Sequence, residues 1–198
     1  MSEHYYSQHP HAATQRRTVT TQLRNQTLSF ITDSGVFSKS GIDFGSRLLI
    51  ESFREPDIQG SFLDMGCGYG PIGITLSKSF PKRRVVMADI NERAVALAEE
   101  NVQTNQVTAE VYQSNLFEQI SGTFAAIVSN PPIRAGKRIV HQIFADAFRF
   151  LEGHGELWTV IQKKQGAPSA LKALEGIFGT VEIVAKKKGY FVFCAKKD

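Results

Sequence analysis

The residues with the clearest chemical character follow a short apolar run, residues 124–129, and read Asn130, Pro131 and Pro132. A side-chain amide oxygen and a neighbouring peptide carbonyl offer two hydrogen-bond acceptors, which suit an amino group with two N–H donors. An exocyclic amine on a base ring is such a group, and its delocalised lone pair makes it a weak nucleophile. If two acceptors bind both N–H groups of this amine, its nitrogen lone pair would point towards an electrophile. Consecutive prolines stiffen the segment and bring no competing N–H.

A second segment, Asp64–Gly70, reads DMGCGYG between an apolar strand and a helix. Its glycines permit unusual backbone angles and remove the Cβ atoms that would block a ligand, and the free N–H groups of the next helix point towards the turn. The dinucleotide fingerprint is G-x-G-x-x-G, but here Pro71 stands at its last glycine. The pattern is instead G-x-G-x-G after an acid, which favours a cationic ligand over a pyrophosphate.

The ends of two further strands carry polar groups that suit a nucleoside. Asp89 ends an apolar run, and an acid at that place accepts hydrogen bonds from ribose hydroxyls. Ser114 and Asn115 follow the next strand and can meet an adenine edge. S-adenosylmethionine joins an adenosine to a sulfonium and an ammonium group and carries no phosphate, and Asp64 can help to hold the positive charge. We therefore predict this cofactor, and methyl transfer to a planar, weakly nucleophilic nitrogen.

The elements that must position these residues alternate between strand and helix from residue 61 onward. The predicted strands are 61–65, 84–89, 110–113, 124–129 and 156–161, the predicted helices are 71–79, 92–104, 137–151 and 169–178, and a last hairpin joins 180–185 to 190–195. Such alternation implies an α/β fold with helices on both faces of the sheet. We predict a Rossmann-like fold whose mostly parallel seven-stranded sheet ends in an antiparallel hairpin.

The first part of the chain predicts an extension to this domain. Residues 1–16 are polar and are expected to form a flexible tail, whose histidines do not suggest a metal site. Residues 18–39 alternate like a small β-hairpin, and Asp43 is placed to cap a helix. The predicted organisation is a tail over 1–16, an extension over 17–60 and a methyltransferase domain over 61–198.

Composition indicates a protein of the cytoplasm. The 198 residues are 42% hydrophobic and 21% charged, which is typical of a globular domain. No apolar stretch is long enough to cross a bilayer, and the N-terminal residues lack the apolar region of a secretory signal. Cys67 and Cys194 lie far apart, which argues against a disulfide framework. Both are better interpreted as small buried residues than as nucleophiles.

Positive charge is clustered along the sequence, although the net charge is only +4. The clusters are Arg134, Lys137 and Arg138; Lys163 and Lys164; and Lys186, Lys187 and Lys188. Each lies near a predicted strand end, where it can contact the phosphates of a nucleic acid. The alternative is a solvated surface with no partner.

These motifs resemble those of the class I S-adenosylmethionine-dependent methyltransferases and, within them, the bacterial 16S ribosomal RNA guanine-N2 methyltransferases. The resemblance covers roughly residues 28–195 and rests on GVFS at 35–38, DFGS at 43–46, DMGCGYGPIGI at 64–74, ADIN at 88–91 and SNPPIRAGK at 129–137. It implies methyl transfer to the exocyclic N2 amine of a guanosine, with ribosomal RNA or the small ribosomal subunit as the partner.

The residues and the resemblance together predict a role for each position. Catalysis is assigned to Asn130, Pro131 and Pro132. Cofactor binding is assigned to Asp64, Gly66, Cys67, Gly68, Gly70, Asp89, Ile90, Ser114, Asn115 and Asn130. Substrate binding is assigned to Phe37, Ser38, Ile133, Arg134 and Lys137.

Two features depart from the family pattern. Many amino methyltransferases carry an aromatic residue after the second proline, which stacks on the flipped base; Ile133 stands there, so stacking must come from elsewhere, such as Phe37, or be replaced by aliphatic packing. The better-known ribosomal members also carry a second N-terminal domain. The tail, with Arg16 and Arg17, is expected to bind RNA and so to compensate for the lack of that second domain.

Other functions remain open from the sequence. Asn-Pro-Pro motifs also serve adenine-N6 and protein glutamine methyltransferases, which usually have an aromatic residue at the place of Ile133. A non-catalytic RNA-binding or assembly factor could retain the same fold. A dehydrogenase is disfavoured by Pro71.

Overall fold

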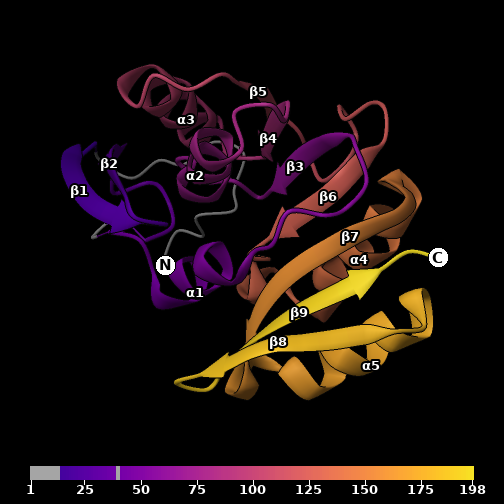
Figure 1. The fold of residues 1–198 in the computed structure, drawn as a ribbon. Coiled ribbons are helices and arrows are strands. Elements are labelled where there is room, and N and C mark those ends of the chain that lie inside the picture. Colours follow the sequence, from indigo (N-terminus) through magenta and orange to yellow (C-terminus); the bar gives the residue numbers. More distant parts are fainter. Residues whose placement is uncertain (1–13, 39–40) are drawn as a thin grey trace.

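The computed structural model describes residues 14–38 and 41–198, so most of the predicted tail lies outside the described residues. A seven-stranded sheet in the order β5-β4-β3-β6-β7-β9-β8 forms the centre of the molecule (Figure 1). Its strands are β3 (Ser61–Met65), β4 (Val85–Asp89), β5 (Ala109–Gln113), β6 (Phe124–Ser129), β7 (Leu151–Gln162), β8 (Val181–Lys187) and β9 (Tyr190–Lys196). Strands β3 to β7 pair in parallel, and β9 lies antiparallel between β7 and β8. The predicted fold class is confirmed.

Helices cover both faces of the sheet, as the alternating pattern requires. The helical segments are α1 (Phe44–Ser52), α2 (Pro71–Ser79), α3 (Glu92–Thr104), η1 (Ile133–Ala135), α4 (Lys137–Phe150), η2 (Lys163–Gln165) and α5 (Ala167–Phe178). Helices α1, α2 and α3 share one buried cluster with the sheet, and α4 and α5 share the other. Successive residues of β3 alternate between the two clusters, with Phe62 in the first and Leu63 in the second. This alternation follows from the period of two along a strand.

The N-terminal hairpin is shorter than the sequence predicts. Strands β1 (Arg17–Leu23) and β2 (Gln26–Thr32) are joined at Arg24 and Asn25, which both have positive φ, as a tight two-residue hairpin turn requires. The strand ends at Thr32, so the predicted continuation through Phe37 is wrong. Residues 33–38 instead form turns, because the Asp33-Ser34-Gly35 sequence favours a turn.

The hairpin is fastened to α3 by two asparagine side chains. Asn101 accepts a hydrogen bond from the Ile31 N–H at 2.7 Å and donates to the Ile31 carbonyl at 2.8 Å. Asn105 makes the same pair of bonds with Ser29, at 3.0 and 2.7 Å. These amides satisfy the backbone of an edge strand that would otherwise be unpaired. The segment after the hairpin is thereby held close to the main sheet.

Strand β7 begins earlier than predicted. It starts at Leu151, so α4 ends one residue sooner, and residues 152–155, predicted as a loop, belong to the strand. Gly153, His154 and Gly155 look like a turn in the sequence, and His154 does adopt a positive φ. An irregularity in the pairing with β6, between Phe124 and Ala126, accommodates these residues within the strand. Helix α5 also begins two residues earlier than predicted, at Ala167.

The carboxyl ends of the parallel strands lie along one edge of the sheet, where ligands bind in folds of this kind. The turn between β8 and β9 lies at the same edge, because β9 runs antiparallel to β7 (Figure 1). Within the described residues, every helix is too short or too polar to cross a lipid bilayer.

Candidate active site and cofactor cavity

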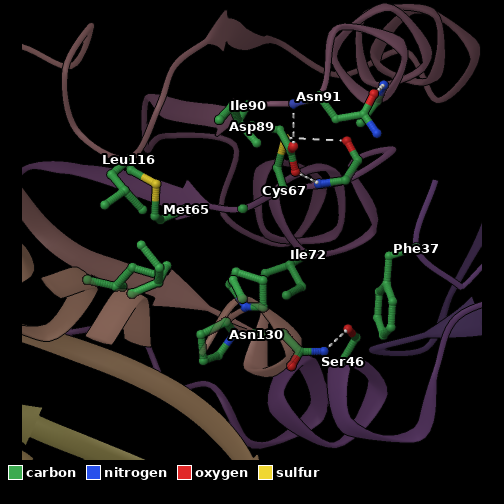
Figure 2. A pocket seen from close by; sticks show the side chains of 18 of the residues that line it. Phe37, Ser46, Met65, Cys67, Ile72, Asp89, Ile90, Asn91, Leu116 and Asn130 are labelled. Carbon is green, nitrogen blue, oxygen red and sulfur yellow. Dashed lines mark hydrogen bonds between the residues drawn. The ribbon is translucent and has the colours of Figure 1, made fainter. Parts of the chain in front are cut away.

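A cavity of about 380 Å³ lies at the carboxyl ends of β3, β4 and β6 (Figure 2). It brings together most of the residues that the sequence predicts for the site: Phe37, Ser38, Gly66, Cys67, Gly68, Asp89, Ile90, Ser114, Asn115, Asn130, Pro131 and Pro132. In Figure 2, Asp89 and Asn130 lie on opposite sides of this space, with Ile72 between them. A cavity of this size lies in the usual range for a small-molecule or cofactor site.

The glycine turn forms one wall of the cavity and leaves it open. Gly66 and Gly68 have φ angles of 75° and 57°, a left-handed conformation that glycine adopts without steric cost. A Cβ atom added at either residue would meet nothing within 4 Å, so the space above the turn is free for a ligand. The Gly66 and Cys67 N–H groups donate to the Ala88 carbonyl at 2.8 and 2.9 Å, which fastens the turn to the end of β4.

Asp89 connects the glycine turn to the start of α3. Its carboxylate accepts hydrogen bonds from the Gly68 N–H at 2.8 Å and from the Asn91 N–H at 2.9 Å. Burial raises the pKa of Asp89 above its ordinary value, and the backbone donors of Asn91 and Gly68 oppose that rise. Each carboxylate oxygen retains acceptor capacity towards the cavity. The arrangement therefore suits a ligand with neighbouring hydroxyl groups.

Asp64 lies beneath the glycine turn and is not part of the cavity lining. Its side chain is buried against α2, where one oxygen accepts the Gly73 N–H at 2.8 Å. The other oxygen is buried and has no partner among the described residues. Burial raises the pKa of Asp64 to about 7; the Gly73 N–H lowers it and the charge of Asp89 raises it. Gly70 also lies outside the lining.

The raised pKa of Asp64 predicts that binding of a cationic cofactor depends on pH. A cation in the cavity favours the ionised carboxylate, so binding should release protons near pH 7, and affinity should rise between about pH 6 and pH 8. Calorimetry with S-adenosylmethionine in buffers of different ionisation enthalpy measures this release. In Asp64→Asn the release should be reduced. Equal proton release in both proteins would contradict the assignment to Asp64.

Asn130 is oriented by a residue that is distant in sequence. Its amide nitrogen donates to Ser46 Oγ at 2.9 Å and lies 3.5 Å from both carboxylate oxygens of Asp43 (Figure 2). The preceding Ser129 donates through its hydroxyl to the Met65 carbonyl at 2.8 Å, which fastens the end of β6 to β3. In the part of the chain that the structure describes, no group donates to Asn130 Oδ1. That oxygen is therefore available to a donor on a ligand.

Asp43 and Ser46 line the cavity, although the sequence motifs assign neither of them to the site. The sequence predicts Asp43 only as a helix cap, and its carboxylate does accept the Ser46 N–H at 3.1 Å. The motif DFGS was visible in the sequence, but nothing in it shows the contact with Asn130, which lies 84 residues from Ser46.

Tyr69 is a further residue of the lining that the sequence did not assign. Its side chain is 2% exposed, yet its hydroxyl has no hydrogen-bond partner among the described residues. Its ring packs edge-on against Phe30, with the ring centroids 5.9 Å apart. Burial, and then the negative charge of Asp43, raise the pKa of Tyr69 above its ordinary value. The neutral hydroxyl is thus available to a polar atom of a ligand or to water.

We predict opposite effects of Tyr69→Phe on stability and on binding. Removing a buried, unpartnered hydroxyl should leave the free energy of unfolding unchanged or raise it by about 1 kcal/mol. Affinity for the ligand that this hydroxyl contacts should fall about 5-fold, as for the loss of one hydrogen bond. Thermal unfolding, together with binding of the cofactor and of RNA, tests both effects. A less stable variant with unchanged affinities would contradict this role.

Of the predicted substrate residues, Phe37 and Ser38 line the cavity, and Ile133, Arg134 and Lys137 do not. Phe37 is 40% exposed and lines the cavity close to Ser46 (Figure 2). Ile133 packs against the cluster of α4 and α5, and neither Arg134 nor Lys137 belongs to the lining. The short helix η1 turns the chain before α4 begins, so other residues of this segment face the cavity: Ala135, Arg138, Ile139 and Ile143. No sequence pattern predicted this turn.

The fold and this site together define a class I, Rossmann-like methyltransferase. The family model of the methyltransferase small domain matches residues 27–194 of the chain. The chain belongs to this family, and it is a methyltransferase that uses S-adenosylmethionine.

The chain is similar to several known proteins, and the alignment covers all of one relative and about half of another. "Uncharacterized protein YbxB" of Bacillus subtilis is 54% identical over 200 residues, covering 100% of both chains. "Ribosomal RNA small subunit methyltransferase C" of Erwinia tasmaniensis is 33% identical over 83% of this chain and 48% of its own length; the chain thus spans about half of that relative. The structure of the T. thermophilus 16S rRNA N2 G1207 methyltransferase, in complex with AdoMet and guanosine, matches with a TM-score of 0.82, at 24% identity over 96% of this chain and 52% of that chain. This last likeness shows the fold.

Proposed function

We propose that this protein transfers a methyl group from S-adenosylmethionine to the exocyclic N2 amine of a guanosine in small-subunit ribosomal RNA. The observation that carries the proposal is the orientation of Asn130. Because its amide nitrogen is bound to Ser46 Oγ, its oxygen is left as an acceptor at the end of β6. The relatives named as ribosomal RNA small subunit methyltransferases support that RNA as the substrate class.

The residues of the upper wall in Figure 2 suit the cofactor. The open space at Gly66 and Gly68 admits a ligand close to the backbone, and Asp89 offers acceptors for ribose hydroxyls. Ser114, Asn115 and Leu116 line the part of the cavity beyond β5, where we place the adenine. Two carboxylates, the buried Asp64 and the half-buried Asp89, favour a ligand with net positive charge over a phosphate. When bound, the cofactor supplies an electrophilic methyl group on a positively charged sulfur.

The residues at the end of β6 hold the methyl acceptor. Asn130 Oδ1 and the Pro131 carbonyl oxygen accept the two hydrogens of the amine, so that its lone pair faces the methyl carbon. As the N–C bond forms and the C–S bond breaks, positive charge develops on nitrogen, and both acceptors stabilise it. The nitrogen then loses one proton to water. No strongly basic side chain is needed, since the amine becomes acidic as it is methylated.

Phe37 is placed to stack on the base. It is an exposed aromatic side chain beside the cavity. Ile133, at the position where many amino methyltransferases carry their aromatic residue, is partly buried and packs against the core instead. Base–aromatic stacking contributes roughly 1–3 kcal/mol for a flipped or single-stranded base. Phe37 therefore replaces the missing aromatic residue from a different segment of the chain.

A positively charged surface borders the cavity on the side of α4 and the β8–β9 turn. It is formed by exposed side chains that the sequence showed as separate clusters: Arg134, Lys137, Arg138, Lys163, Lys164, Lys186, Lys187 and Lys188. The Lys163 N–H donates to the Gly189 carbonyl at 2.7 Å, and the Lys188 ammonium lies 5.0 Å from the centre of the Phe44 ring. Segments 130–140, 162–170 and 184–192 contain no Asp or Glu. We assign this surface to the RNA backbone.

Two lysines of the β8–β9 turn provide a test of this surface. In the double variant Lys187→Ala with Lys188→Ala, affinity for unmodified small-subunit RNA should fall about 10-fold, and the slope of log affinity against log salt should decrease by roughly 1.5. Cofactor affinity should not change. A matched control is Lys78→Ala with Lys82→Ala, since these exposed lysines lie at the other edge of the sheet. Equal losses in both double variants would show that only net charge matters.

The proposed reaction is tested in the cell by deleting the gene. Ribosomal RNA of the deletion strain, digested to nucleosides, should contain less N2-methylguanosine than the parent, and the gene should restore it. The amount of N2-methylguanosine could instead stay unchanged while the amount of N6-methyladenosine, or of methylated glutamine in protein, changes. That result would show that the methyl acceptor is adenine or glutamine.

A further inference from the structure

The cavity contains a carboxylate whose presence is not explained by the steps described above. Asp43 is half-buried, lines the cavity and precedes α1. Its Oδ1 accepts the Ser46 N–H at 3.1 Å and thereby caps the helix. Both of its oxygens lie 3.5 Å from Asn130 Nδ2, at the outer limit of hydrogen bonding. Oδ2 therefore keeps most of its acceptor capacity beside the amide that we assign to the methyl acceptor.

Capping alone does not require a charge at this position. Serine, asparagine and aspartate cap helices about equally well, while a carboxylate in a half-buried wall loses solvation. Among residues 14–38 and 41–198, no Lys or Arg forms an ion pair with Asp43. The Tyr69 hydroxyl, another member of the lining, lacks a hydrogen-bond partner within the described residues. A donor on the ligand would compensate the carboxylate.

We infer that Asp43 is a specificity-determining residue that accepts the N1–H of the target guanine. The inference rests on the proposed function. On the Watson–Crick edge of guanine, the N1–H donor is adjacent to the 2-amino group, so Asn130 and Asp43, which are also adjacent, accept from neighbouring donors. The neighbouring Asp43 carboxylate and Asn130 amide oxygen therefore complement two donors on one edge of guanine, N1–H and the 2-amino group.

The same arrangement disfavours the other amino groups that an Asn-Pro-Pro motif can serve. Adenine presents its 6-amino group beside N1, which is an acceptor, so Asp43 would face a lone pair and be left without a donor. The side-chain amide of glutamine presents its amino group beside a carbonyl oxygen, with the same result. A partly buried acceptor that one ligand pairs and another leaves unpaired discriminates between the two ligands. Asp43 thus selects guanine, while Asn130 and Pro131 act on the amine itself.

The conservative variant Asp43→Asn separates this role from helix capping. Asparagine keeps an oxygen for the Ser46 N–H and replaces the other oxygen with an N–H donor. That donor opposes the N1–H of guanine. It complements 2-aminopurine, which keeps the 2-amino group but has a bare acceptor nitrogen at N1. Asp43→Ser is the matched control, because serine caps the helix and offers neither group at the base.

Calorimetry on the full chain, saturated with S-adenosylhomocysteine, measures binding of guanosine and of 2-aminopurine riboside. Wild-type protein should prefer guanosine, and Asp43→Asn should shift the ratio of the two affinities towards 2-aminopurine riboside by roughly 10-fold or more. Asp43→Ser should lose the preference for guanosine without favouring 2-aminopurine riboside to the same extent. The melting temperatures of both variants verify that α1 is intact.

Two results would overturn the inference. In the first, Asp43→Asn loses affinity for both nucleosides in parallel, and Asp43 is then only a positioning residue for Asn130. In the second, the wild-type protein binds neither nucleoside, and the pocket then does not recognise the Watson–Crick edge of the base. In either case, N2-methylation of ribosomal RNA by the wild-type protein would leave the proposed function standing. Absence of guanine methylation in any RNA would instead refute that function.

Discussion

Asn130→Ala should lower the rate of methyl transfer by roughly 100-fold or more and leave affinity for S-adenosylmethionine nearly unchanged. The variant removes an acceptor that is used most strongly as charge develops on the amine nitrogen, and loss of one such group commonly has an effect of this size. Single-turnover transfer to unmodified small-subunit RNA gives the rate, and calorimetry gives the affinity.

Ser46→Ala supplies the graded comparison for this prediction. It keeps the Asn130 side chain but removes the hydroxyl that binds its amide nitrogen at 2.9 Å, so the rate should fall less, by about 10-fold. A normal rate in Asn130→Ala would exclude the amide from catalysis and would favour a non-catalytic RNA-binding protein.

Asp89→Asn should weaken binding of S-adenosylmethionine by about 100-fold. The carboxylate already accepts the Gly68 and Asn91 N–H groups, and its remaining lone pairs are assigned to the ribose hydroxyls. Asparagine keeps the shape but loses the charge and one acceptor, and charge-assisted hydrogen bonds are about twice as strong as neutral ones. Calorimetry at constant pH measures the affinity.

The control for Asp89 is Glu118→Gln. Glu118 is exposed, lies outside the cavity lining and accepts Asn115 Nδ2 at 2.8 Å, so its variant makes the same change of charge near the site. Affinity should change less than 3-fold there. If both variants bind the cofactor equally well, the ribose assignment is wrong.

Local patterns predicted much of the fold and one half of the site. The G-x-G-x-G turn and the strands that end at Asp89 and Ser129 are contiguous in sequence, and the structure places their ends at one edge of the sheet. The roles of these residues in binding and catalysis remain predictions. The cofactor and the methyltransferase family are confirmed by the match to the methyltransferase small domain.

The other half of the site depends on contacts between distant segments. Asp43 and Ser46 meet Asn130 across 87 and 84 residues, and a single sequence contains no signal for such pairing. Arg138 rather than Arg134 lines the cavity, because η1 inserts a turn before α4. The predicted start of β7 is wrong because the glycines on either side of His154 are typical of a loop. Pairing with β6 keeps the segment in the sheet.

The N-terminal extension belongs to the site and does not merely precede it. The Asn91 amide donates to the Gly35 carbonyl at 3.0 Å, and Arg93 pairs with Asp33 at 3.4 Å. These contacts hold the segment that carries Phe37 against the start of α3. A boundary at residue 60 therefore separates residues that share one cavity, and truncation there should remove Phe37, Asp43 and Ser46 together.

The most direct measurement is mass mapping of RNA after reaction with the pure protein. Unmodified small ribosomal subunits, or their naked RNA, are incubated with S-adenosylmethionine, and the RNA is digested and sequenced by mass. The account predicts one added methyl group on the N2 of a guanosine, absent after reaction with Asn130→Ala. A methyl group on adenine or on protein, or no transfer to either form of the RNA, would contradict it.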